Sequence, residues 1–233
     1  MRTEHVLEVS TLTKNLGTRA ILEDVCLHVD VGEVVGLLGR NGSGKSTLLQ
    51  TVMGSLPSDT GDIRLGGELI NYLSMSDRAC KGMGLLTEGM AELGGMTVVD
   101  GLVSELEKMP PASTDSRQYL MEVLAAYGLS MQKEQRVDTL SPGQSRRFGI
   151  CRSMLARPHL LMMDEPFSGV GPQEQTEVKT VIRGLPSHGT SVLIADHNAK
   201  QALEVCNRAY VLVTGKIITE GSASDLLKIG SYR

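Results

Sequence analysis

Aromatic side chains are scarce in this sequence of 233 residues, which has no Trp, two Phe and five Tyr. Proteins that bind single-stranded nucleic acid stack the bases on aromatic rings, and membrane proteins place Trp and Tyr at the lipid interface. An excess of basic charge is absent as well, because 23 Lys and Arg stand against 27 Asp and Glu. Without such an excess no overall basic field favours a phosphate backbone, so nucleic acid is not expected as the main partner.

Long apolar runs and paired cysteines are also missing. The longest apolar runs cover residues 34–38, 160–163, 191–195 and 209–213, whereas a transmembrane helix needs roughly 20 apolar residues. The N-terminus has no apolar segment typical of a secretory signal. The four cysteines lie far apart without the spacing of metal ligands, and we expect them to be buried and reduced. These features predict a cytoplasmic chain.

The period of the apolar residues changes along the chain and indicates its organisation. Residues 34–38 are continuously apolar, as a strand buried on both faces must be. Residues 62–65 and 68–70 flank two glycines and predict a hairpin. From about 97 to 136 a helical period dominates, and Gly128 is a plausible helix end.

After residue 136, apolar strands alternate with amphipathic helices, which favours a parallel sheet flanked by helices. We therefore predict an α/β fold with a phosphate-loop core, an N-terminal antiparallel β subdomain and an inserted helical subdomain. The whole chain, 1–233, is expected to form one domain. Its core would comprise about 1–89 and 137–233, and the helical subdomain about 90–136.

A phosphate-binding loop is predicted directly after the apolar run 34–38. The sequence there fits G-x-x-x-x-G-K-[ST], in which glycines let backbone N–H groups turn toward a polyphosphate. In this pattern Lys45 reaches the β- and γ-phosphates and the Ser46 hydroxyl binds Mg²⁺. The nucleotide-binding residues are Gly39, Arg40, Asn41, Gly42, Ser43, Gly44, Lys45, Ser46 and Thr47.

Two carboxylates follow the apolar run 160–163. Asp164 is suited to hold Mg²⁺ through water, and Glu165 is placed to polarise the water that attacks the γ-phosphate. Further along, Ser141 is expected to cap a helix that ends before Pro158 and carries Phe148 on its apolar face. The N-terminus of that helix could face an anion.

The segment Leu140-Ser141-Pro142-Gly143-Gln144, with the phosphate loop, Asp164-Glu165 and Asp196-His197, resembles the ATP-binding cassette (ABC) ATPases of ABC transporters. The resemblance covers essentially the whole chain. It implies ATP and Mg²⁺ as ligands, and a dimer of cassettes in which Ser141, Gly143 and Gln144 contact the ATP of a second ATPase subunit. Separate transmembrane permease subunits would hold this chain at the inner face of the cell membrane.

The same resemblance implies further site residues. His197 stands at the position of the family's switch histidine, which contacts the γ-phosphate and helps orient Glu165. Glu88 stands where many members have a Gln that touches Mg²⁺ and the attacking water. Leu16 replaces the aromatic residue that stacks on adenine, so we expect weaker selection for adenine over guanine. The Met-rich stretch 90–96 is a candidate docking surface for a permease helix.

The departures from the family pattern are unevenly distributed. Pro142 replaces a glycine of the signature, and Gly171 replaces an Asp that normally contacts the opposite subunit. The residues for this chain's own nucleotide are intact, while those offered to a partner's nucleotide are altered. We therefore expect a dimer of either kind, and suspect a heterodimer in which the partner has a more standard signature.

Two branches of the family compete. Thr87-Glu88-Gly89 and residues 198–203 resemble the branched-chain amino acid importer ATPases, which we take as the main hypothesis. Arg146-Arg147 and Asp196-His197-Asn198 look more like the ATPase of lipopolysaccharide export. A third hypothesis is a soluble ATP-dependent regulator with weak hydrolysis.

Overall fold

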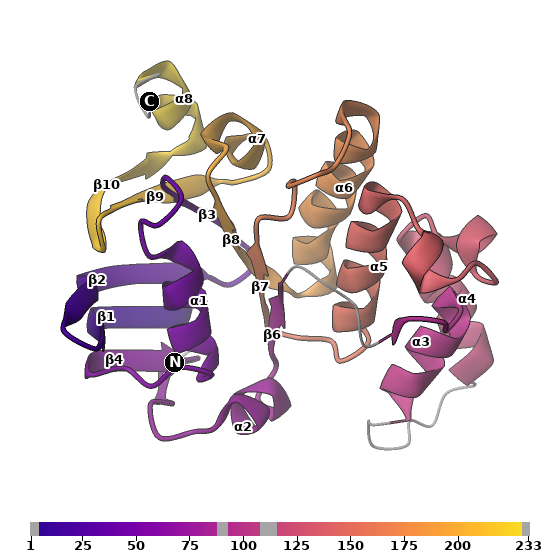
Figure 1. Ribbon diagram of the computed structural model, residues 1–233, viewed down its shortest axis with the longest axis horizontal. Coiled ribbons are helices and arrows are strands. Elements are labelled where there is room, and N and C mark those ends of the chain that lie inside the picture. Colours follow the sequence, from indigo (N-terminus) through magenta and orange to yellow (C-terminus); the bar gives the residue numbers. More distant parts are fainter. Residues whose placement is uncertain (1–4, 88–92, 108–115, 230–233) are drawn as a thin grey trace. The chain divides into compact units, whose positions relative to one another are not determined.

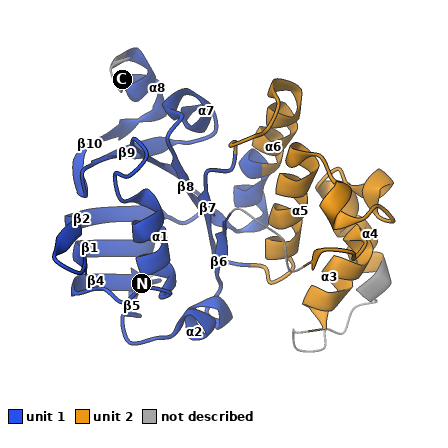
Figure 2. Ribbon diagram, viewed as in Figure 1, with its two compact units in different colours: residues 1–87, 158–166, 182–233 blue, residues 88–157, 167–181 orange. Residues whose placement is uncertain are grey.

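The structure is a computed structural model that describes residues 5–87, 93–107 and 116–229 (Figure 1). The chain divides into two compact units (Figure 2). The first contains residues 1–87, 158–166 and 182–233, and the second contains residues 88–157 and 167–181. The sequence motifs for this chain's own nucleotide fall in the first unit, and the signature falls in the second.

A six-stranded sheet forms the centre of the first unit, in the order β10-β9-β3-β8-β7-β6. All neighbouring strands are parallel except the antiparallel pair β9 and β10. The strands are β3 (Val34–Leu38), β6 (Met83–Leu86), β7 (Leu160–Asp164), β8 (Ser191–Asp196), β9 (Arg208–Val213) and β10 (Lys216–Ser222). All four strands expected from the apolar runs are therefore confirmed, and they are the four central strands of the sheet, between β10 and β6 at its edges.

Helices cover both faces of this sheet, which explains why its strands are continuously apolar. Val35 and Leu37 on β3 point into a core shared with α1 (Lys45–Met53). Leu38 points to the other face, where it packs with α7 (Ala199–Leu203) and α8 (Ala223–Ile229). Alternate side chains of one strand thus fill two separate apolar clusters.

The second sheet of this unit is antiparallel, in the order β2-β1-β4-β5. Its strands are β1 (His5–Leu16), β2 (Arg19–Asp30), β4 (Thr60–Leu65) and β5 (Glu68–Leu69). The short helix α2 (Met75–Cys80) follows β5. Val25, Leu27 and Val29 alternate inward as their spacing predicts. The hairpin around Gly66 and Gly67 is also confirmed, and both glycines have positive φ as a two-residue turn of this kind requires.

Helices build the second unit. They are α3 (Val98–Leu106), α4 (Ser116–Ala126), α5 (Pro142–Met154) and the first ten residues of α6 (Pro172–Gly184). Two short 3-10 turns, η2 (Ser130–Gln132) and η3 (Val137–Thr139), belong to the same unit. A third turn, η4 (Leu185–His188), follows α6 and belongs to the first unit. No described helix has the length and apolar character needed to cross a membrane.

The helical unit is larger than the insertion expected over residues 90–136. It continues to residue 157, so that it includes α5, and it also takes residues 167–181. The reason is packing between α5 and α3, in which Phe148 is fully buried and lies against Gly101. A Cβ at Gly101 would lie 2.9 Å from Cζ of Phe148. Phe148 therefore ties the signature helix to α3 of the second unit.

The four cysteines do not share one environment. Cys151 and Cys206 are buried as expected, and burial raises the pKa of each thiol to about 12. The expectation was wrong for Cys26 and Cys80, which are exposed. Cys26 alternates with inward residues of β2, and Cys80 is the last residue of the short helix α2. Their positions on the outer faces of amphipathic elements explain the difference.

We predict that a water-soluble disulfide reagent modifies two thiols quickly in the native protein and all four after denaturation. Only the thiolate reacts, and burial suppresses both access and ionisation at Cys151 and Cys206. Intact-mass spectrometry over time measures the number of modified thiols. The double variant Cys26→Ser/Cys80→Ser is the control, because it should show no fast phase. Fast modification of three or four native thiols would contradict the assignment.

Candidate nucleotide-binding site

The predicted strand, loop and helix are confirmed around residues 39–47. β3 ends at Leu38 and α1 begins at Lys45. Gly42 and Gly44 have φ of 80° and 109°, which an L side chain rarely adopts. A Cβ at Gly39 would lie 2.4 Å from the carbonyl oxygen of Leu212. Glycine is therefore favoured at three positions of the loop. The N–H groups in the first turn of α1 have no acceptor within that helix, as at any helix N-terminus.

Lys45 is folded back over this loop. Its Nζ donates to the carbonyl oxygen of Gly39 at 2.8 Å and to that of Arg40 at 3.3 Å, and the residue is only 5% exposed. Burial lowers the pKa of Lys45, while the negative charges of Glu165, Asp164 and Asp196 raise it in opposition. The ammonium group thus sits near three carboxylates at the start of the first helix.

The register of the sheet brings these groups together. β3 pairs with β8 so that Leu38 lies opposite Asp196, and β8 pairs with β7 so that Ala195 lies opposite Asp164. The carboxyl ends of the three parallel strands therefore meet at one edge, where ligands of open α/β sheets bind. Asp164, Glu165 and His197 are placed beside the phosphate loop as the sequence predicted.

Glu165 and His197 form a contact at this edge. Nδ1 of His197 lies 3.1 Å from Oε1 of Glu165 and 3.8 Å from Oδ1 of Asp196. Glu165 has a φ of 47°, which is uncommon for a residue with a side chain, and its N–H donates to the carbonyl oxygen of Ala195 at 2.8 Å. Strained backbone of this kind is concentrated at functional sites. Here it orients the Glu165 carboxylate toward the loop cavity, which that residue lines.

A cavity of about 400 Å³ lies over the loop. Its lining residues are Arg19, Ile21, Asn41, Gly42, Gly44, Lys45, Ser46, Thr47 and Glu165. Sequence reasoning missed Arg19 and Ile21, although their i, i+2 spacing on β2 puts them on one face. Leu16 is 48% exposed and is paired with Arg19 across the β1–β2 turn. Leu16 is not among the described residues that line the cavity.

The site fits an anion together with a divalent cation. In the described part of the chain, Ser43 Oγ and Asp196 Oδ2 are buried without a hydrogen-bond partner. A Ser hydroxyl and an Asp carboxylate are oxygen donors of the kind that Mg²⁺ uses beside substrate phosphates, and Ser46 and Asp164 offer them at this edge. Glu88, predicted to act on Mg²⁺ and the attacking water, lies outside the described residues, as do residues 90–92 of the expected docking stretch.

The predicted partner-facing residues lie in the second unit, where Ser141 caps α5. Ser141 Oγ accepts from the N–H of Gln144 at 3.2 Å, and the Gln144 side chain accepts from the N–H of Ser141 at 3.0 Å. Pro142 occupies the first helical position, where an N–H has no partner within the helix in any case. Pro142 is therefore compatible with an intact signature helix. Ser141 Oγ also contacts the carboxylate of Glu174, which sequence reasoning did not single out.

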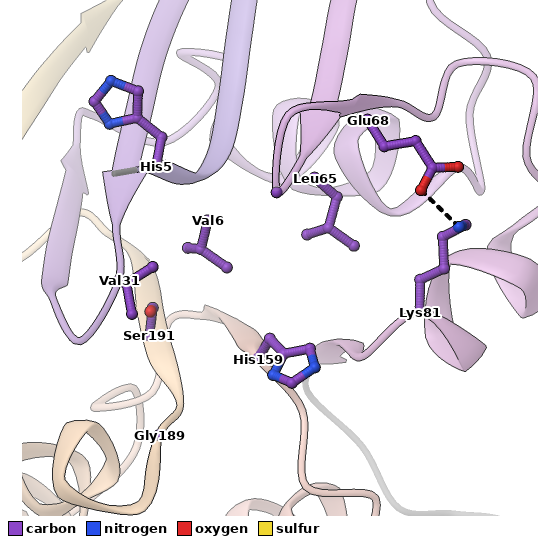
Figure 3. A pocket seen from close by; sticks show the side chains of 10 residues that line it. His5, Val6, Val31, Leu65, Glu68, Lys81, His159, Gly189 and Ser191 are labelled. Carbon is purple, nitrogen blue, oxygen red and sulfur yellow. Dashed lines mark hydrogen bonds and ion pairs between the residues drawn. The ribbon is translucent and has the colours of Figure 1, made fainter. Parts of the chain in front are cut away.

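A second cavity, of about 310 Å³, lies at the amino ends of β7 and β8 (Figure 3). Glu68 and Lys81 in its wall are paired at 2.8 Å, as the dashed line in Figure 3 marks. Nδ1 of His5, in the same wall, lies 2.5 Å from Oδ1 of Asp30. These contacts join strand ends of the first unit, and we assign the nucleotide to the opposite edge of the sheet.

Comparison with known proteins identifies the family. The sequence pattern of the family described as "ABC transporter" matches residues 22–168. The chain is an ABC transporter ATPase. The ABC ATPase is 35% identical to the lipopolysaccharide export system ATP-binding protein LptB of Haemophilus influenzae, over 95% of this chain and 92% of that protein. LptB of Escherichia coli K12 is 34% identical over the same shares.

Solved structures agree on the fold. A nucleotide-free ATP-binding cassette from an ABC transporter superposes with a TM-score of 0.87 at 25% identity, covering 97% of this chain and 94% of the other. A cassette in its ADP conformation also superposes with a TM-score of 0.87, at 26% identity, covering 96% and 93%. The predicted phosphate-loop α/β fold is confirmed.

The family also decides the activity. The ABC ATPase is the ATP-binding subunit of a transporter and couples ATP hydrolysis to transport. The hypothesis of a regulator without transport is therefore set aside. These relatives do not support the main hypothesis of a branched-chain amino acid importer. They are named as lipopolysaccharide export ATP-binding proteins, which fits the alternative hypothesis.

The buried carboxyl of Asp196 makes stability depend on pH in a predictable direction. Burial raises the pKa of Asp196 in the folded protein. In the unfolded chain the carboxyl ionises at its ordinary, lower pKa, so ionisation favours the unfolded state. This cost is absent at low pH, where Asp196 is protonated in both states, and grows as the pH rises through the folded pKa. The free energy of unfolding of Asp196→Asn, relative to the parent, should therefore increase from pH 4 to pH 7.

Urea unfolding at several pH values measures this difference. Asp225→Asn is the matched control, because hydrogen bonds from Ser222 and Lys228 lower the pKa of Asp225. Its stabilising charge is lost as pH falls, so its substitution should show the opposite slope. Equal slopes for the two variants would contradict the assignment for Asp196.

Proposed function

We propose that this ABC ATPase powers export of lipopolysaccharide or a related envelope lipid through separate transmembrane permease subunits. The observation that carries the proposal is identity of 35% and 34% to two lipopolysaccharide export ATPases over 95% of the chain. Asp196-His197-Asn198 and Arg146-Arg147 favour the same branch. Through the permeases the chain would be held at the inner face of the membrane.

The site geometry supports a specific division of roles in hydrolysis. Backbone N–H groups of the loop and of the first turn of α1, with the Lys45 ammonium, bind the β- and γ-phosphates. Ser46 and Asp164, with Glu88, would hold Mg²⁺, which neutralises charge that develops on the phosphates. Glu165 orients the attacking water and accepts its proton, and His197 holds Glu165 through the 3.1 Å contact.

The partner of the dimer is part of the proposal. Ser141, Gly143 and Gln144 would contact the ATP bound by a second cassette, since the N-terminus of α5 favours an anion. Pro142 and Gly171 alter this face, whereas the residues for the chain's own ATP are unaltered. The difference supports a partner with a more standard signature, and so a heterodimer.

Substitution of Glu165 tests the assigned chemistry. We expect Glu165→Gln to lower the ATP turnover number by a factor on the order of 10² to 10⁴, because the amide cannot accept the proton of the attacking water. ATP affinity should remain close to that of the parent, since the phosphates are held by the loop. Phosphate release and nucleotide binding are measured on the same preparation. Glu68→Gln, in a surface ion pair, is the control; turnover retained by Glu165→Gln would refute the role.

The transported class is tested on the complete transporter. Chemical cross-linking in native membranes, followed by mass spectrometry, should recover envelope-lipid permeases, and lipopolysaccharide should stimulate ATP turnover of the complex in nanodiscs. The importer remains the second candidate because of Thr87-Glu88-Gly89. Recovery of a periplasmic binding protein, with stimulation by that protein loaded with a branched-chain amino acid, would favour import and overturn the proposal.

A further inference from the structure

Glu174 contacts the signature in a way that the sequence did not predict. Glu174 lies in the first turn of α6, and its carboxylate accepts a hydrogen bond from Ser141 Oγ at the start of α5. Both residues belong to the second unit. The hydroxyl that the proposed function assigns to a partner's ATP is therefore already bonded within this chain.

The contact extends to the backbone of the signature helix. A Cβ at Gly143 would lie 2.5 Å from Cβ of Glu174, 2.8 Å from its Cδ and 3.0 Å from Oε1. The carboxylate therefore lies against the first turn of α5, where the positive end of the helix dipole favours negative charge. Glu174 supplies that charge in place of an external anion.

An alternative place for the carboxylate exists in the same unit. A cavity of about 730 Å³ is lined by Glu174, Gln144, Arg147 and Glu177, among others. Arg147 is 7% exposed and pairs with Glu177 at 2.8 Å, yet its Nε has no hydrogen-bond partner in the part of the chain that is described. A Glu174 side chain released from Ser141 can thus turn into a cavity that contains a buried guanidinium.

We propose that Glu174 is a built-in competitor of the γ-phosphate: it occupies the signature of this chain and must turn away before a partner's ATP can bind there. The inference rests on the proposed function of the signature. Two anions at one helix N-terminus repel each other, so association of two copies is weakened while ATP binding to each phosphate loop is not. Glu174 thereby disfavours self-pairing and acts as a specificity residue for the choice of partner cassette.

The test uses the full chain with Glu165→Gln, which keeps bound ATP intact. Dimer formation is measured by light scattering as ATP is titrated, and ATP binding to the monomer is measured separately. With Glu174→Gln added, half-maximal dimer should need on the order of tenfold less ATP, because one charged competitor is removed. Glu134→Gln is the control, since it removes the same charge from an exposed residue of the same unit that does not line the cavity. Glu174→Ala is a second variant in case the amide still bonds to Ser141.

The gain should also depend on the signature hydroxyl. In a Ser141→Ala background, Glu174→Gln should have little effect on the ATP concentration for half-maximal dimer. The reason is that the Glu174 carboxylate and the γ-phosphate compete for the Ser141 hydroxyl. The inference is overturned if ATP binding is unchanged and neither Glu174 variant forms more dimer, or if Glu134→Gln gives an equal gain. Either result leaves the proposed function intact. Failure of the chain to bind ATP at all would instead refute the proposed function.

Discussion

Parallel pairing of β3, β8 and β7 is the constraint on which the rest of the first unit depends. Because Leu38 lies opposite Asp196 and Ala195 opposite Asp164, three strand ends coincide at one edge. Each strand end is followed by a different functional group: the glycine-rich phosphate loop after β3, the Asp164-Glu165 pair after β7, and Asp196-His197 after β8. A slip of one residue in any pairing would turn these side chains to the opposite face of the sheet. The apolar side chains that fix the register are therefore as necessary to catalysis as the polar ones.

Charge balance at this edge explains why the site is a nucleotide site and not a buried ion cluster. Lys45 faces Asp164, Glu165 and Asp196, and burial opposes the charged form of Lys45 and of Asp196. Buried charges are costly unless they are compensated. The phosphates and the cation of a bound nucleotide supply compensation of both signs. Binding of the nucleotide and its cation would relieve part of the electrostatic cost of burying these charges.

Local patterns sufficed to predict much of this structure, while long-range packing set the remainder. Residues 34–38 and the glycine loop were predictable because continuous apolar runs and positive-φ positions are written in the local sequence. The extent of the helical unit was not, since it depends on Phe148 meeting Gly101 some fifty residues away. Arg19 and Glu174 were missed for the same reason: a charged residue on an exposed face has no local signal, and only the fold brings Arg19 to the loop and Glu174 to Ser141.

The backbone of Glu165 has a consequence for how this protein would change over generations. Its φ of 47° costs free energy for any residue with a branched or long side chain, whereas Gly, Asn and Asp adopt such angles more readily. Selection would retain glutamate at this position only while its carboxylate contributes to ATP turnover. A descendant cassette that no longer hydrolysed ATP would gain stability by drifting to Gly or Asn at this position. We therefore expect the residue at position 165 to differ between cassettes that hydrolyse ATP and cassettes that have lost this activity.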